Sequence, residues 1–224
     1  MTQEEIIRDM RIRCRQAMNG IVSTSMRKWG LDYKVNFGLT IQQIKDIAKR
    51  YSPDATLAET LWSENTRELK IMGTLLYPIN KYPEETADKW VEEITNQEIR
   101  EQICFNLYQE LPYAGNLSMK WSKNQTSSIR VTGYWLLSRL MLLKRSKDIL
   151  PESLPYVWED ILSEDSFLCN AALLALKQIG RQSKDIAEIV LQRILAYKES
   201  EDRLKREVYD SLDFEFEYFF ENKP

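Results

Sequence analysis

The sequence predicts an all-α fold in which pairs of helices stack into a solenoid with a concave groove. The first observation is a weak repeat of four segments, each opening with a polar or cationic residue and continuing with small and apolar residues at helical spacing. These segments start 33, 30 and 40 residues apart, at Arg67, Arg100, Arg130 and Asn170. The second is the scarcity of helix breakers, with seven Gly and seven Pro in 224 residues. Because stacked repeats curve, the concave side is the surface where a partner is expected.

The N-terminal part contains two helices on either side of an irregular segment. Apolar residues at helical spacing predict a helix over residues 2–18. The segment 19–38 holds three glycines and is expected to be irregular. Thr40 and Gln43 then form a capping-box pattern, which predicts a helix that runs to Tyr51.

The rest of the chain is predicted as helix pairs, each bounded by capping residues, Pro or Gly. The pairs are 54–62 with 65–77, 83–94 with 97–110, 115–123 with 126–145, and 154–162 with 166–179. Two further helices are expected at 183–198 and 201–211. The stretch 214–220 alternates like a short strand, although a docking helix or extended cap that seals the last repeat fits an all-α context better.

No linker or low-complexity tract interrupts the chain, so we expect a single domain over 1–224. Residues 1–38 form its N-terminal helix and loop, and residues 212–224 form its C-terminal tail. No apolar run approaches the roughly 20 residues that cross a bilayer, so no membrane is expected as a partner. The acidic, polar opening of the chain does not resemble a signal peptide.

Composition excludes several kinds of chemistry. The chain has no histidine, which removes His-based triads and His-ligated zinc. Its three cysteines, Cys14, Cys104 and Cys169, are dispersed, as in reduced proteins of the cytoplasm, and each is expected to be a buried small hydrophobe. The sequence therefore predicts no metal site and a cytoplasmic location. The net charge of −3 is unusual for a nucleic-acid binder, but it permits a basic stripe on one face.

Three stretches, in order along the chain, resemble one known family. They are Phe37–Lys49, Leu57–Trp62 and Trp90–Asn96. Their order and spacing resemble the DNA alkylation repair proteins of the AlkD type, over about residues 30–210. No single motif among them is highly specific.

This resemblance implies a stack of HEAT-like helical repeats around a C-shaped groove that binds duplex DNA. Active members of the family are DNA glycosylases that release cationic N3- or N7-alkylated purines without flipping the base, unlike most glycosylases. An alkylated purine is already a cationic leaving group. The enzyme then needs a carboxylate and aromatic faces to stabilise the developing charges, and no cofactor or metal.

Carried over residue by residue, the resemblance changes the family's catalytic pair. Glu101 takes the place of the family's carboxylate, an aspartate, and Gln97 takes the place of a tryptophan four residues earlier. Leu174 takes the place of a second tryptophan. Glu98 is an alternative carboxylate. Tyr33, Tyr134 and Trp135 are candidates to replace the missing aromatic faces, although core packing is the usual role of such residues.

The resemblance also implies a set of DNA contacts. Arg130 matches a backbone-gripping arginine, Lys177 falls near a second one, and Trp29 loosely matches an N-terminal aromatic contact. Together with these, the sequence suggests a cationic stripe; its members are Arg130, Lys177, Arg181, Arg67 and Lys70. Surface salt bridging is the alternative role for these cations.

Two function hypotheses follow. The first is a DNA glycosylase that hydrolyses the N-glycosidic bond of N3- or N7-alkylated purines in duplex DNA, with Glu101 supporting the cationic sugar. The second is a non-catalytic HEAT-repeat relative that binds unusual DNA structures or a protein partner. The absence of both tryptophans and the acidic pI of about 5.4 favour the second hypothesis.

Overall fold

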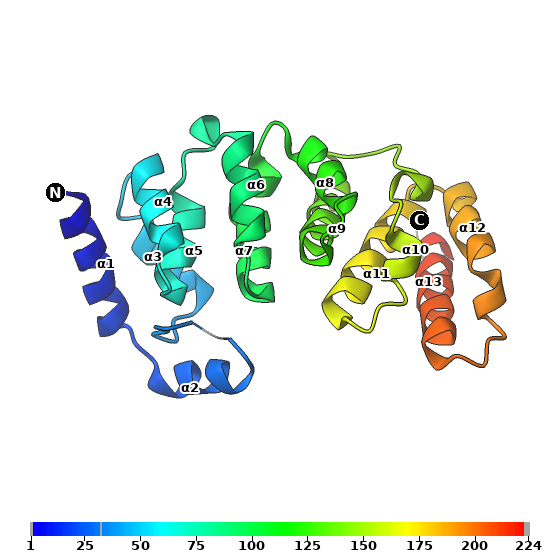
Figure 1. The fold of residues 1–224 in the computed structure, drawn as a ribbon, viewed down its shortest axis with the longest axis horizontal. Coiled ribbons are helices and arrows are strands. Elements are labelled where there is room, and N and C mark those ends of the chain that lie inside the picture. The colour runs from blue at the N-terminus through cyan, green and yellow to red at the C-terminus, as the bar shows by residue number, and fades with distance from the viewer. Residues whose placement is uncertain (1, 32, 222–224) are drawn as a thin grey trace. The chain divides into compact units, whose positions relative to one another are not determined.

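The computed structural model describes residues 2–31 and 33–221, which Figure 1 draws as a coloured ribbon. The chain divides into two compact units. Unit 1 comprises Met1–Leu111 and unit 2 comprises Pro112–Pro224. One continuous domain over 1–224 stays a prediction. In the described part of the chain, no helix has the length and apolar character needed to cross a membrane.

Unit 1 is built from helices around the central helix α5. Its elements are α1 (Gln3–Gln16), α2 (Gly20–Lys28), α3 (Ile41–Ala48), α4 (Ala55–Ser63), α5 (Arg67–Leu76), η1 (Ile79–Lys81), α6 (Glu84–Glu92), α7 (Gln97–Asn106) and η2 (Tyr108–Glu110). Helix α5 packs against α3, α4 and α7. Fully buried apolar side chains such as Leu61, Trp62 and Leu69 form the core between them.

The helix starts in unit 1 follow from capping chemistry. The Thr40 hydroxyl accepts a hydrogen bond from the Gln43 amide at 3.2 Å, and the Gln43 side chain accepts one from the Thr40 amide at 2.9 Å. Asn96 caps α7 by accepting from the Ile99 amide at 3.1 Å. These side chains satisfy amides that have no partner inside the helix.

The prediction of an irregular segment over 19–38 was wrong for its first half, which forms α2. Asn19 caps this helix by accepting from the Val22 amide. Gly38 has φ 73°, and a Cβ there would collide with the Asn19 carbonyl. Glycine therefore permits the chain to fold back against α2. In the stretch between α2 and Gly38, Val35 forms an isolated parallel β-bridge with Thr66.

Unit 2 continues the pattern of paired helices. Its elements are α8 (Ala114–Ser122), α9 (Ser127–Leu142), η3 (Pro151–Ser153), α10 (Val157–Asp160), α11 (Ser166–Gly180), α12 (Lys184–Arg193), η4 (Leu195–Tyr197) and α13 (Arg203–Glu221). Helices α8 and α9 pack closely because position 133 is glycine. A Cβ there would press into the backbone of Trp121 and Ser122. Helix α11 packs against α9, α10, α12 and α13.

Two elements of unit 2 differ in extent from the sequence-based expectation. The predicted helix over 154–162 is reduced to the short α10, Val157–Asp160, preceded by a turn of 3-10 helix. The helix predicted over 201–211 continues through the tail as α13, so the tail is helical and not a strand. Phe216 from α13 is buried in the hydrophobic core of unit 2. The all-α prediction is confirmed. Residues 222–224 of the predicted tail lie outside the described residues.

Candidate nucleic-acid interface

The proposed catalytic pair lies on one face of α7. Gln97 and Glu101 are one helical turn apart, and the Gln97 amide donates a hydrogen bond to the Glu101 carboxylate at 2.9 Å. The Arg100 guanidinium donates to the side-chain oxygen of Gln97 at 2.7 Å. Both side chains of the pair are half-buried. This face therefore presents a hydrogen-bonded row of polar side chains, Arg100, Gln97 and Glu101, where the family resemblance calls for an aromatic ring beside a carboxylate.

An aromatic residue does lie one turn further along the same face. Phe105 is four residues after Glu101, and 45 % of its surface is exposed. Lys45 from α3 places its ammonium 4.8 Å from the centre of the Phe105 ring. The α7 face thus carries an amide, a carboxylate and an aromatic ring in successive turns.

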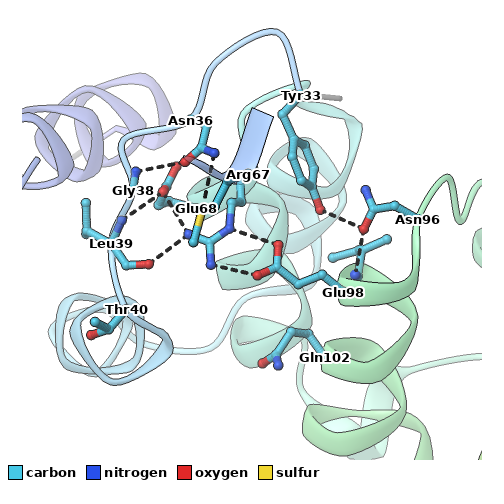
Figure 2. Close-up of polar contacts among 12 residues, drawn as sticks. Tyr33, Asn36, Gly38, Leu39, Thr40, Arg67, Glu68, Asn96, Glu98 and Gln102 are labelled. Carbon is cyan, nitrogen blue, oxygen red and sulfur yellow. Dashed lines mark hydrogen bonds and ion pairs between the residues drawn. The ribbon is translucent and has the colours of Figure 1, made fainter. Parts of the chain in front are cut away.

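Arg67 lies inside unit 1, in a network that Figure 2 shows. Only 1 % of its surface is exposed. Its guanidinium binds both oxygens of Glu98 from α7, at 2.8 and 2.7 Å. It also donates to the Leu39 carbonyl at 2.8 Å and to Glu68 at 3.0 Å. A phosphate contact by Arg67 would require breaking this buried pair, and the assignment of Arg67 to DNA stays a prediction.

The same network ties the stretch 33–39 to the helices. The Glu68 carboxylate accepts from the backbone amides of Phe37, at 3.1 Å, and Leu39, at 3.3 Å. The Tyr33 hydroxyl donates to the Asn96 side chain at 3.4 Å, as Figure 2 shows. Burial opposes the charge of Arg67, but hydrogen bonds and charges from Glu98 and Glu68 outweigh it and raise its pKa. Glu98, held by Arg67, therefore has a structural role, and this makes it a poor alternative to Glu101.

Arg130 is held in a matching way in unit 2. It forms a bidentate pair with Asp160, with both distances at 2.7 Å, and only 10 % of its side chain is exposed. It also donates to the carbonyl groups of Asn124 and Gln125, at 3.1 and 2.8 Å. Tyr134 donates to Asp160 as well, at 2.8 Å. A DNA phosphate would have to displace a buried carboxylate to reach Arg130.

Two other cations of unit 2 that are predicted to contact DNA, Lys177 and Arg181, share one carboxylate. Arg181 pairs closely with Glu215 of α13, and Lys177 lies 3.8 Å from the same carboxylate. The Arg181 guanidinium also lies 4.9 Å from the centre of the Phe219 ring. Their side chains remain 25–30 % exposed, so these two cations keep a partial surface.

Lys70 packs against tryptophan. Its ammonium donates to the Trp62 carbonyl at 2.8 Å and lies 4.5 Å from the centre of the Trp62 ring. Burial lowers the pKa of Lys70. Trp62 itself stacks on Trp90 with ring centres 4.4 Å apart. Lys70 is thus engaged with an aromatic core.

These contacts share a spacing of about one repeat. Arg67 and Glu98 are 31 residues apart, Arg130 and Asp160 are 30 apart, and Arg181 and Glu215 are 34 apart. Neutral pairs follow the same rule, since Thr74 and Asn106 are 32 apart. The arginines that open two of the repeated segments therefore join one helix pair to the next.

The aromatic residues that the sequence offered as DNA contacts differ in exposure. Tyr33 and Tyr134 are at most 3 % exposed, and Trp135 is partly buried against the core of unit 2. None of the three offers an open ring. Leu174 lies half-buried on α11. Trp29, by contrast, is 84 % exposed at the end of α2. Its assignment to DNA stays a prediction.

Sequence reasoning missed how unevenly charge is distributed along the chain. Residues 1–50 contain ten Lys and Arg against five Asp and Glu, a net charge of +5. The remaining residues contain 21 against 29, a net charge of −8. The overall net charge of −3 conceals a cationic N-terminal portion, which a charge count by segment reveals.

Comparison with known proteins gives a family and a fold. The family model described as DNA alkylation repair enzyme matches residues 16–208. No curated protein matches the sequence significantly. A solved structure described as "a new family of proteins related to the HEAT-like repeat DNA glycosylases with affinity for branched DNA structures" has a TM-score of 0.67 at 14 % sequence identity. The alignment covers 96 % of this chain and 95 % of that one. At this identity the likeness shows the HEAT-like repeat fold alone. Since the family model spans most of the sequence, this chain belongs to the DNA alkylation repair enzyme family.

Proposed function

We propose that this protein binds DNA and recognises its structure, without excising alkylated bases. The observation that carries the proposal is the hydrogen-bonded row of polar side chains on α7. Gln97 donates to Glu101 and accepts from Arg100, so it presents an amide where stacking on a cationic base needs an aromatic face. The affinity of the structurally similar proteins for branched DNA supports binding as the retained activity.

Base excision is the second candidate, and the spacing on α7 favours it. A carboxylate at Glu101 can stabilise the oxocarbenium-like sugar that forms as a cationic purine leaves. The half-exposed Phe105 ring one turn away would have to supply the aromatic contact that Gln97 lacks. In this reading alkylated duplex DNA is the substrate, and no cofactor takes part.

Release of methylated purines from an alkylated duplex separates the two candidates. Wild type, Glu101→Gln and Phe105→Ala are incubated with the duplex at protein concentrations shown to bind it. We expect binding by all three proteins and no release above the spontaneous rate. Release by wild type that disappears in Glu101→Gln would overturn the non-catalytic proposal and establish the glycosylase.

A further inference from the structure

A depression on unit 1, away from α7, is lined by cations that have no assigned role. It measures about 580 Å³ and is bordered by α1, by residues 34–37, and by the turn between α4 and α5. Its basic lining residues are Arg11, Arg15 and Lys34. Arg11 and Arg15 are one turn apart on α1 and therefore project from the same face.

Most of the side-chain groups that this depression offers to a ligand are hydrogen-bond donors. Among the described residues, nothing pairs with the side chains of Arg15 and Lys34, which are both exposed. The Asn65 side chain uses its oxygen to accept the Lys34 amide at 3.0 Å, and this leaves its NH₂ group as a further donor. Among the described lining residues the one carboxylate is Glu64, which is already paired with Arg11 at 2.6 Å.

Such a set of donors matches a ligand that only accepts hydrogen bonds and carries negative charge. A phosphate group has that character, and arginine recognises it well because its planar guanidinium can bind two oxygens. The three basic residues of the depression also lie within residues 1–50, the portion of the chain with a net charge of +5. A DNA strand carries such groups at regular intervals, and their contacts fix the position of a protein on the strand.

We propose that the depression formed by Arg11, Arg15, Lys34 and Asn65 binds a backbone phosphate of DNA. This inference rests on the proposed DNA binding and assigns part of it to a site outside α7. The site would position DNA on unit 1 without reading its sequence, since phosphate contacts carry no base information.

The test compares two double variants that each remove two exposed positive charges from unit 1. Arg15→Ala/Lys34→Ala removes the two unpaired cations of the depression, and Lys81→Ala/Lys89→Ala is the matched control outside it. Fluorescence anisotropy measures DNA affinity across a salt series. We expect the depression variant to bind about tenfold more weakly or worse. Its slope of log K against log salt should be shallower by about one unit for each phosphate that the variant no longer binds. The control should stay close to wild type.

Other results would overturn the inference in distinguishable ways. Equal losses of affinity in both double variants would mean that general charge, and not this depression, holds the DNA. If wild type binds no DNA at low salt, the proposed function fails and the inference fails with it. A titration with inorganic phosphate, followed by NMR of the Arg15 side chain, covers a third case. Saturable phosphate binding with an unchanged DNA salt slope would identify a site for free anions.

Discussion

At the scale of single residues, the cations that attract attention in the sequence are mostly structural. Arg67 and Arg130 look like members of a phosphate-binding stripe, yet each is buried against a carboxylate about one repeat further along the chain. Their charge is evident from the sequence but their partners are not, because contact between residues 30 apart depends on how successive helix pairs pack. Arg15 and Lys34 lie on no repeated segment, and their side chains form no pair within the described part of the chain.

The pair between Arg130 and Asp160 should be sensitive to loss of one member. Asp160→Ala leaves a buried guanidinium and the Tyr134 hydroxyl without their acceptor, so we expect a loss of about 3–5 kcal/mol in unfolding free energy. Glu207→Ala removes the partner of Arg203 in an exposed pair and should have little effect. Urea denaturation measures both. A similar small change in both variants would show that Arg130 is not held as described.

Tyr33 should make stability depend on alkaline pH. Burial raises its pKa from 10.0 to about 12, so the folded state keeps a proton that the unfolded chain releases. This stability is fully present below pH 10 and is lost as pH rises towards 12. Tyr33→Phe removes one ionisable group and should make that part of the curve less steep, while Tyr51, whose pKa burial also raises to about 12, keeps its contribution. Unfolding free energies measured across this alkaline range provide the check, and parallel curves for variant and wild type would contradict the burial of Tyr33.

At the scale of elements, local capping signals predicted helix starts well. Thr40 with Gln43 marked α3, and Asn96 marked α7. The signals failed where tertiary packing decides the outcome. Helix α2 was missed because it opens at Gly20, exposes Ile21 and buries mainly Ser23, which leaves no apolar periodicity to read. In the tail, alternation left a short strand open beside the preferred docking helix or extended cap, and the structure has the helix α13, whose buried residues include Phe216.

The cap on α3 can be tested against a cap that makes no bond. Thr40→Ala removes the capping box and should lower the unfolding free energy of unit 1 by about 1 kcal/mol. Thr126 occupies the same position before α9 but makes no side-chain capping bond, so Thr126→Ala should change stability little. Denaturant midpoints compare the two variants. An equal loss of stability in both would mean that the hydrogen bonds to Gln43 contribute nothing.

At the scale of the whole molecule, the fold class could be read from the sequence, whereas the accessibility of the candidate site residues could not. Repeat spacing, scarce glycine and the order of three motifs were enough for an all-α repeat protein of the DNA alkylation repair family. The candidate site depended on which side chains remain accessible. Gln97 and Glu101 are four residues apart and contact each other on one helix face, whereas no local rule in the sequence indicated that Arg67 is buried.

The net charge of −3 is compatible with DNA binding because the charge is segregated. An N-terminal portion of net charge +5 can attract phosphates while the remainder of the chain, at −8, repels them. Binding that depends on such a portion should weaken steeply with salt.

The most direct test of DNA binding is the affinity of wild-type protein for a four-way junction and for a linear duplex of equal length. Anisotropy is measured at low salt and then across a salt series. We predict saturable binding of both, tighter for the junction, with log K falling linearly as log salt rises. Absence of binding to either DNA at low salt would contradict the proposed function.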